Sequence, residues 1–286
     1  MRATGTLLGL LLLAVAAVTA QSQEKPREVK TEHGLAVFKL GEKFATDDHA
    51  GKTMDSFCSF LGSRHPEALF VRRGVRNKPE DALALLKSDT AKVSVAIVSP
   101  GFYLAHRKAL KLTVLAEAGR DGTDGEEYVL LGLQAAAEYP AGARVATSLS
   151  ADADWLNKAV LPAPAGKAAV QWVPYDNLFD AGYAMLDGEK DAPQYVLVDR
   201  VTLKAMQADP DLKELKAGLK SELLPQDLVV EVDSRLGNLR EALKQTLATL
   251  DKSDEGKAQG KALQSPVFKA PAAERLAKVE KLIGDQ

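Results

Sequence analysis

The sequence predicts an α/β fold in two lobes, each a mostly parallel sheet flanked by helices, with a hinge and a central cleft. Apolar stretches of strand length alternate with stretches of helical periodicity along most of the 286 residues, as in helix-covered sheets. Val93–Val98 and Tyr195–Asp199 are apolar on both faces, which is typical of parallel strands buried on both sides. About nine such strands would be many for one open sheet, so two smaller sheets fit better.

The first twenty residues have the layout of a cleaved secretory signal peptide. Arg2 supplies a basic start, an apolar run extends from Leu7 to Val18, and small residues end the segment at Ala20. A membrane anchor is the alternative, but this run is shorter than the roughly 20 residues that a span requires. We therefore expect residues 1–20 to be removed and the mature chain to be a soluble monomer, periplasmic or secreted. Residues 21–33 are polar and without period, which predicts a flexible N-terminus.

Strands are expected where short apolar stretches end in turn residues, and helices where apolar residues recur at helical spacing. The expected strands are Leu35–Leu40, Ala68–Val75, Val93–Val98, Leu112–Glu117, Tyr128–Leu133, Arg144–Thr147, Ala168–Val173, Gln194–Asp199 and Leu228–Val232. The expected helices are Thr53–Leu61, Pro79–Leu86, Pro100–Ala109, Ala151–Ala159, Asp176–Leu186 and Val201–Gln207, followed by two amphipathic helices within 235–250 and 273–283.

Two polar segments are the best crossings between the lobes. The chain is expected to leave the first lobe through Glu117–Glu127 and to return through Lys220–Leu228. Lobe 1 would then comprise residues 34–125 plus 226–286, and lobe 2 residues 126–225. The late amphipathic helices would cover the core of lobe 1.

Composition excludes several classes of function. The chain has 37 Lys and Arg against 39 Asp and Glu and no basic cluster, so nucleic acid is not an expected partner. Cys58 is the only cysteine, which rules out an internal disulfide and a cysteine-rich zinc site. The G-x-S-x-G, H-E-x-x-H, Walker A and G-x-G-x-x-G motifs are missing, and the four histidines lack metal-ligand spacing. We expect no enzymatic activity, no cofactor and no metal site.

The first candidate binding site follows the strand Val93–Val98. Ser99 is well placed to cap a helix, and Gly101 permits a close approach of a ligand. Tyr103 could form a wall of the pocket. A helix N-terminus of this kind suits an anion. The alternative, a capped helix whose aromatic residues pack into the core, has equal local support.

Other candidate positions also lie where strands end. Thr147, Ser148 and Ser150 place hydroxyls on a strand-to-helix turn, an arrangement that suits an anion but more often caps a helix. The remaining candidates are Tyr175, Asp176 and Asp199, and the last of these could meet a cationic group on a ligand or only cap the next helix. In open parallel sheets, ligands bind at such carboxyl ends.

Several motifs resemble the substrate-binding proteins of phosphate, phosphite and phosphonate ABC importers, which are type II periplasmic binding proteins. VSVAIVSPGFYL is similar to the family's third-strand motif, and AMLDGEKDAPQYVLVD to the segment that ends in an Asp. Residues 243–283 resemble the family's C-terminal helix pair, with an Asp-x-x-x-Glu-Gly link. TSLSADADW departs from the family's Ser-Thr-Ser-Gly anion site by lacking the Gly and by carrying two acidic residues.

The resemblance implies an exported solute-binding protein that captures a small anionic or zwitterionic ligand between two lobes. An oxyanion, a phosphonate or an organic acid would be the ligand, and an ABC permease or a membrane sensor the partner. The alternative is an exported interaction or sensor-partner protein that kept the fold and lost the phosphonate site.

Overall fold

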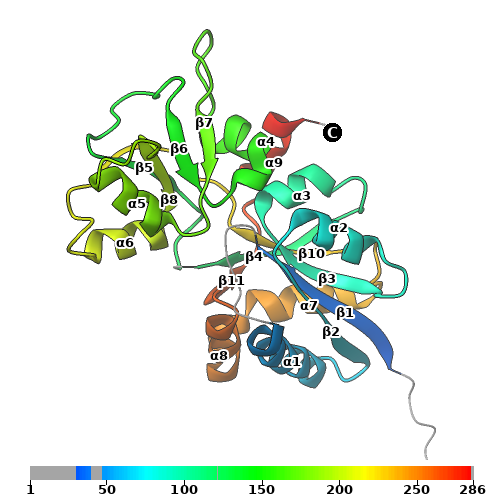
Figure 1. The fold of residues 1–286 in the computed structure, drawn as a ribbon. Coiled ribbons are helices and arrows are strands. Elements are labelled where there is room, and N and C mark those ends of the chain that lie inside the picture. Colours follow the sequence, from blue (N-terminus) through cyan, green and yellow to red (C-terminus); the bar gives the residue numbers. More distant parts are fainter. Residues whose placement is uncertain (1–29, 40–46, 121, 285–286) are drawn as a thin grey trace, which may run out of the picture.

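The computed structural model describes residues 30–39, 47–120 and 122–284, so the expected signal peptide lies outside the described residues (Figure 1). These residues form two sheets, one in each of two lobes. The sheet of lobe 1 has six strands in the order β11-β4-β10-β3-β1-β2. Their bounds are β1 (Thr31–Phe38), β2 (Ala68–Arg76), β3 (Val93–Val98), β4 (Thr113–Gly119), β10 (Asp227–Glu231) and β11 (Val267–Lys269). Strand β1 thus begins inside the segment 21–33 that the sequence predicts to be flexible.

The sheet of lobe 2 has five strands in the order β7-β6-β8-β5-β9. Their bounds are β5 (Tyr128–Gly132), β6 (Arg144–Thr147), β7 (Gln171–Pro174), β8 (Tyr195–Asp199) and β9 (Lys216–Lys220). Strands β9 and β11 have no counterpart among the predicted strands. Both are short, and their residues are mostly half-buried or exposed, so neither carries a continuous apolar run.

Both sheets are mixed, and most strands of each run in one direction, as predicted: β1 to β4 in lobe 1 and β6 to β9 in lobe 2. Strands β1, β2 and β3 pair in parallel, but β10 runs antiparallel between β3 and β4. Its first residues pair near the ends of its neighbours, Asp227 with Ala118 and Leu228 with Val98. In lobe 2, Tyr128 at the start of β5 pairs with Asp199 at the end of β8. Each crossing therefore enters a sheet at the edge where the neighbouring strands end. The strand that follows the crossing consequently runs antiparallel to those neighbours.

The two crossings between the lobes lie side by side. Residues 120–127 lead from β4 to β5, and residues 221–226 lead from β9 back to β10. Glu126 and Leu224 form an antiparallel bridge between them, with a backbone hydrogen bond of 2.8 Å in each direction. The backbone connection between the lobes is thus a pair of short, hydrogen-bonded segments.

Helices cover the faces of both sheets (Figure 1). Lobe 1 contains α1 (Asp47–Arg64), α2 (Pro79–Lys87), α3 (Pro100–His106), α7 (Leu239–Ala248), the 3-10 turn η3 (Leu250–Lys252) and α8 (Asp254–Ala262). Lobe 2 contains α5 (Leu178–Leu186) and α6 (Arg200–Ala208). Three short helical segments, η1 (Ser150–Asp152), α4 (Ala153–Trp155) and η2 (Leu156–Val160), replace the single helix expected at Ala151–Ala159. The last helix, α9 (Ala273–Ile283), contacts η2 of lobe 2.

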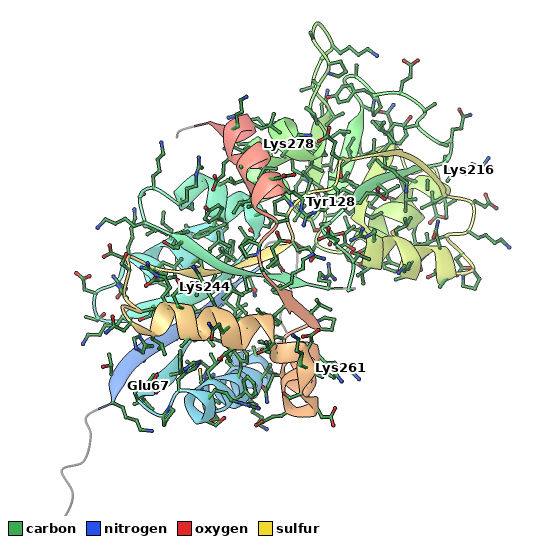
Figure 2. All side chains as sticks on the ribbon, turned by 180° about the vertical axis from the view of Figure 1, so that it is seen from behind. Glu67, Tyr128, Lys216, Lys244, Lys261 and Lys278 are labelled. Atoms are coloured by element: carbon green, nitrogen blue, oxygen red, sulfur yellow. The ribbon has the colours of Figure 1, made fainter. Side chains whose placement is uncertain are left out.

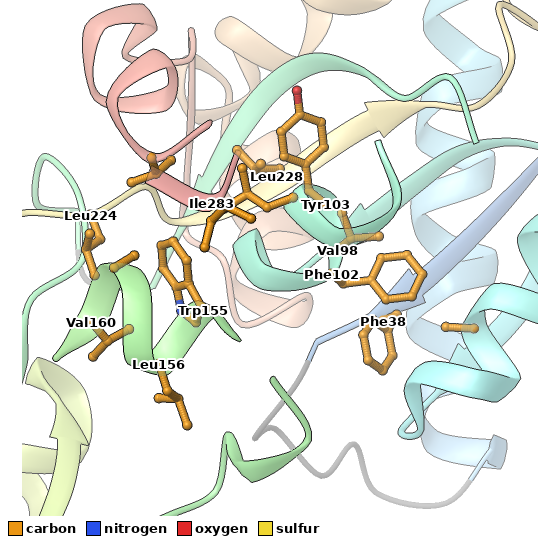
Figure 3. Close-up of a cluster of buried hydrophobic side chains, with 14 of the residues drawn as sticks. Phe38, Val98, Phe102, Tyr103, Trp155, Leu156, Val160, Leu224, Leu228 and Ile283 are labelled. Carbon is orange, nitrogen blue, oxygen red and sulfur yellow. The ribbon is translucent and has the colours of Figure 1, made fainter. Parts of the chain in front are cut away.

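One apolar core is continuous across the two lobes. Alternation along β1 sends Leu35 and Val37 to a core beneath α1 and α7, and Phe38 to the opposite face. On that opposite face, residues of lobe 1 pack in one cluster with Trp155 of α4 and Ile283 of α9 (Figure 3). Helix α9 lies beside α4 and near α3 at the junction of the lobes (Figure 1). The apolar cluster therefore holds the lobes together in this arrangement.

A third, separate core fills lobe 2 between its sheet and helices α5 and α6, with Val196 and Val198 of β8 at its centre. Within residues 30–39, 47–120 and 122–284, no helix is both long enough and apolar enough to cross a bilayer.

Candidate ligand-binding site

A cavity of about 50 Å³ lies where the two lobes meet. Both crossings, the ends of β4 and β8 and the turns that follow β3 and β6 contribute to its wall. The lining residues are Pro100, Ala118, Arg120, Glu126, Tyr128, Ser148, Leu149, Leu178, Leu197, Asp199, Pro225, Gln226 and Asp227. Figure 2 shows Tyr128 at the junction of the lobes. The cavity has room for only a few atoms besides hydrogen, because one water needs about 10–15 Å³ measured in this way.

Arg120 and Asp199 form an ion pair across the cavity wall. A guanidinium nitrogen of Arg120 donates to Oδ2 of Asp199 at 2.5 Å. The other oxygen of Asp199, Oδ1, accepts from the backbone N–H of Thr202 at 2.7 Å and so caps helix α6. Asp199 therefore caps the next helix, which is one of its two predicted roles, and the cation that it contacts is Arg120 of the protein itself.

Glu126 is the second carboxylate of the cavity and is 7% exposed. Burial, together with the negative charge of Asp199, raises the pKa of Glu126 to about 7, although the nearby Arg200 acts in the opposite direction. The Arg200 Nε atom lies 4.0 Å from Oε1 of Glu126. A carboxyl group with this pKa is partly protonated near neutral pH.

Asp227 is the third carboxylate, and a buried lysine holds it in place. The Nζ atom of Lys39, whose side chain is 1% exposed, lies 3.3 Å from Oδ2 of Asp227. The same ammonium donates to Oγ of Ser265 at 2.8 Å and to the carbonyl of Leu263 at 3.2 Å. Lys39, which directly follows β1, thus contacts both the turn before β11, through hydrogen bonds, and the first residue of β10, through an ion pair.

Tyr128 is surrounded by charged groups of the cavity. Burial raises the pKa of the Tyr128 hydroxyl well above its usual value, and three carboxylates, Glu126, Asp199 and Asp227, raise it further, whereas Arg120 lowers it. Each of these carboxylates also has a basic residue near it, Arg200, Arg120 and Lys39 respectively. The cavity wall therefore carries both signs of charge.

Gln226 contributes a buried carboxamide that has no protein partner. The residue is 3% exposed, and neither its Nε2 nor its Oε1 has a hydrogen-bond partner in the described structure. The amide lies against Gly119, where a Cβ atom would come within 2.6 Å of Oε1 and 2.9 Å of Nε2. The amide nitrogen, a donor, and the amide oxygen, an acceptor, thus both lack a partner in the described structure.

The residues predicted from the turn after β3 have mainly structural contacts. Ser99 caps α3, with its Oγ accepting from the backbone N–H of Phe102 at 3.5 Å. The hydroxyl of Tyr103 donates to Glu280 of α9 at 2.7 Å, and burial together with this bond raises its pKa. The Asp152 carboxylate of lobe 2 lies against Gly101. Of this turn, only Pro100 lines the cavity. Helix α3, which follows the turn, is short and has seven residues.

The turn after β6 brings one of its three candidate hydroxyls to the cavity. Ser148 lines it, whereas Thr147 is buried and accepts from the backbone N–H of Leu149 at 3.1 Å. Ser150 begins the 3-10 turn η1. Burial raises the pKa of Asp152 in this turn to about 6, and the charge of Asp154 adds to the shift.

Tyr175 and Asp176 lie outside the cavity lining. Tyr175 packs against the core of lobe 2, and its backbone N–H donates to the carbonyl of Thr147 at 3.1 Å. Asp176 is exposed. Of the candidates, the structure therefore brings Ser148 and Asp199 together at the cavity, with Gly101 and Asp152 packed where the lobes meet.

Sequence reasoning missed Arg120, Glu126, Tyr128, Gln226 and Asp227. Four of them lie in the segments that the sequence identifies only as connections, and Tyr128 begins the strand that follows the first crossing. The one sequence signal that could have indicated them is the presence of charged residues on a predicted hinge. In the described part of the chain, no group of three or more His, Cys, Asp or Glu side chains is arranged to hold a metal ion.

Comparisons with known proteins identify the fold. No protein-family model matches the sequence, and no curated protein matches it significantly. Solved structures do match: XAC2383 from Xanthomonas citri, bound to ATP, has a TM-score of 0.66 at 10% identity over 87% of this chain and 96% of that one. PhnD1 from Prochlorococcus marinus, in complex with methylphosphonate, has a TM-score of 0.60 at 13% identity over 87% and 96%.

A binding protein component of an ABC phosphonate transporter from Pseudomonas aeruginosa also matches, with a TM-score of 0.60 at 11% identity over 88% of this chain and 85% of that one. At such identities the likeness concerns the fold alone. The chain has the two-lobed α/β fold of type II periplasmic binding proteins, as the sequence predicts.

Proposed function

We propose that this protein is an exported solute-binding protein that captures a small zwitterionic ligand in the cavity between its lobes. The observation that carries the proposal is the cavity at the crossings, which residues of both lobes line and which contains three carboxylates, a guanidinium and an unpartnered carboxamide. Polar groups buried together in this way favour a polar ligand.

The mixed charge of the cavity suits a zwitterion. Glu126, Asp199 and Asp227 contribute acidic groups to the lining and Arg120 a basic one. Lys39 lies beside Asp227 and Arg200 beside Glu126, so both signs of charge are present. A ligand with both charges can place each one against the opposite sign. Its anionic end would lie toward Arg120 and Ser148.

A phosphonate held in the manner expected from the family resemblance has little support. The helical stretch after β6 is divided into η1, α4 and η2, and neither η1 nor α4 has a side-chain cap. Asp152 and Asp154 place negative charge at its start, which opposes an anion there. A phosphonate that carries an amine still fits the charge of the cavity.

The alternative, a surface-interaction protein without a working pocket, has less support. Buried charged and unpaired polar groups destabilise a fold. A protein that used only its outer surface would gain stability by replacing Gln226 and Glu126 with apolar residues. Their presence at the junction favours a role in binding.

Export and delivery complete the proposal. The layout of residues 1–20 supports export to the periplasm or beyond, and a two-lobed receptor would deliver its ligand to an ABC permease or a membrane sensor. Intact-mass analysis of the exported protein tests the first part. A mature chain beginning near Gln21 is the expected result, and retention of residues 1–20 contradicts it.

A thermal-shift screen tests binding itself. The exported protein is heated with 2-aminoethylphosphonate, phosphoethanolamine and β-alanine, and in parallel with phosphate, methylphosphonate and acetate. A zwitterion at about 100 times its dissociation constant should raise the melting temperature by about 5–10 °C. The matched anions without an amine should leave it unchanged. If no zwitterion stabilises the protein, the proposed function is wrong.

A further inference from the structure

A second cavity lies at the amino edge of the lobe 1 sheet, at the opposite end of its strands from the cavity between the lobes. Its volume is about 580 Å³, which is within the range of small-molecule sites in proteins. The beginnings of β1 and β2 and the turn that connects β10 to α7 line it. Figure 2 shows Glu67, one of its lining residues, at the far end of lobe 1 from Tyr128.

His33 offers a ring nitrogen to this cavity. The residue is 4% exposed, its ring packs against Phe70, and its Nδ1 atom lies 3.3 Å from Oγ of Ser94. The other ring nitrogen, Nε2, has no hydrogen-bond partner among the described residues, and they do not cover it fully. Because His33 lines the cavity, a ligand there can supply the missing partner.

The bond to Ser94 determines what this nitrogen offers. Ser94 is 3% exposed, and its hydroxyl has a single proton. If Nδ1 of His33 carried the ring proton and donated it to Ser94, the hydroxyl proton would be buried without an acceptor, which costs free energy. The hydroxyl therefore donates to Nδ1, and Nε2 carries the ring proton. Burial lowers the pKa of His33, although the buried Glu231 acts in the opposite direction, so the ring is a neutral donor near pH 7.

The charges around the cavity favour an anion. Lys30 and Arg235 contribute two positive charges to the lining, and Glu67 contributes one negative charge. Arg235 also contacts Asp89, but that side chain is 99% exposed and 3.8 Å away. Lys30 has no ion pair within the part of the chain that the structure describes. The balance of the lining is therefore positive.

Helix α7 adds to this preference. It has ten residues and begins beside the cavity at Asn238, whose side chain does not cap it. The positive end of the helix dipole favours a negative group there. Glu241 in the first turn acts in the opposite direction, but it pairs with Lys244 at 3.0 Å. An anion in the cavity would therefore be stabilised by the helix as well as by the basic side chains.

Apolar residues form another part of the wall. Ala68, Leu236 and Leu239 line it, and a bare oxyanion such as phosphate would fill only a small part of the space of about 580 Å³. We propose that this cavity is a second ligand-binding site, and that it takes a carboxylate joined to an apolar chain. The Nε2–H group of His33 donates to the carboxylate, and the chain covers the apolar wall. The proposal goes beyond the function proposed above and does not depend on it.

The first test needs no ligand. Nitrogen-15 spectra of the histidine rings distinguish a protonated Nε2 from a protonated Nδ1, and the signals of His33 are those that His33→Phe loses. A proton on Nε2 is the expected result at about pH 7.5. A proton on Nδ1 would leave Nε2 as an acceptor, which repels a carboxylate, and the inference would be wrong.

The second test measures binding of hexanoate by calorimetry, with two matched probes. Hexanamide keeps the chain and replaces the carboxylate by a neutral amide, and acetate keeps the carboxylate and shortens the chain. Hexanoate should bind with a dissociation constant of about 1 mM or below. Each probe should bind at least about 10-fold more weakly, because one lacks the charge-assisted bond and the other most of the apolar contact. If either probe binds as tightly as hexanoate, or if hexanoate does not bind, the inference is wrong.

Two substitutions locate the bound hexanoate. Asn238 is exposed and its side chain makes no cap, so Asn238→Trp should leave the fold intact while its ring fills the cavity. It should abolish binding, whereas Gln245→Trp, at an exposed position of the same helix outside the cavity lining, should not change it. His33→Phe keeps an aromatic ring against Phe70 and removes the donor, so it should weaken binding at least about 10-fold. Binding of wild-type strength in Asn238→Trp or in His33→Phe would place hexanoate elsewhere and overturn the inference.

Discussion

The carboxylate of Asp152 in lobe 2 packs directly against the α-carbon of Gly101 in lobe 1. A Cβ atom at residue 101 would overlap Oδ2 and Cγ of that carboxylate. Gly101 has no positive φ, so its backbone conformation does not require glycine. The close approach of the other lobe is therefore what requires it.

Gly101→Ala should separate the lobes. The added methyl group cannot share space with Asp152, and the crossings are the backbone connection about which the lobes can move apart. Small-angle X-ray scattering should show a larger radius of gyration for Gly101→Ala than for the wild type. Gly62→Ala is the matched control, because no atom lies within 4 Å of its Cβ position.

A second substitution identifies the cause of the change. Asp152→Ala removes the obstructing carboxylate, so the double variant Gly101→Ala/Asp152→Ala should return to the radius of gyration of the wild type. An unchanged radius in Gly101→Ala alone would mean that the junction adjusts locally and that the lobes do not depend on this contact.

The pH dependence of stability should reveal Glu126. Its pKa is about 7 in the folded protein, against an ordinary value of 4.5, because burial and Asp199 disfavour the charged form. Between these two values the folded state binds more protons than the unfolded state. The contribution of Glu126 to the free energy of unfolding should therefore be largest below about pH 4.5 and should fall as the pH rises to 7.

Glu126→Gln should remove that part of the dependence, because glutamine does not titrate. Urea unfolding at pH 5 and at pH 7.5 measures it, and Glu189→Gln at an exposed site is the control. Equal pH dependence in the wild type and in Glu126→Gln would show that Glu126 is ionised throughout this range.

Much of the fold could be predicted from the sequence, because its signals are local. The apolar run of Val93–Val98 predicts β3 with its observed bounds, and Ser99-Pro100 predicts the capped start of α3. The polar segments Glu117–Glu127 and Lys220–Leu228 contain both crossings. Strand β9 was missed because apolar and polar residues alternate only weakly along it. The antiparallel direction of β10 depends on where the crossing enters the sheet, which is a tertiary feature.

The site was less predictable, because its chemistry depends on tertiary contacts. Nothing local indicates that Arg120 pairs with Asp199, or that Gln226 is buried without a partner. Tyr103 was expected to face a ligand, but its hydroxyl bonds Glu280, which is distant in the chain. Residues at strand ends can be predicted to lie near a site, whereas the residues with which they form hydrogen bonds or ion pairs cannot be predicted.

Trp155 should be a main anchor of the interlobe cluster. It is 3% exposed and packs with residues of lobe 1 and with Ile283 of α9 (Figure 3). Trp155→Ala should lower the free energy of unfolding by about 3–5 kcal/mol, as large-to-small changes in cores do. Trp172→Ala, at a half-buried site in β7, is the control and should cost less. Equal losses in urea unfolding would contradict the special role of Trp155.

The pair of Lys39 and Asp227 should stabilise the protein far more than a surface pair does. The side chains are 1% and 14% exposed, and their charged atoms lie 3.3 Å apart. Lys39→Met leaves Asp227 without this cation in a buried place, so the free energy of unfolding should fall by about 3–5 kcal/mol. Lys39→Met/Asp227→Leu should recover part of the loss, because no uncompensated charge remains.

The pair of Lys111 and Asp233 is the control for this prediction. Its atoms are closer, at 2.8 Å, but the side chains are 74% and 45% exposed. Lys111→Met should change the free energy of unfolding by less than about 1 kcal/mol, because water and salt screen an exposed pair. Urea unfolding of the wild type and the three variants measures all of these values. If Lys39→Met costs no more than Lys111→Met, burial does not strengthen the pair, and Asp227 has enough support without Lys39.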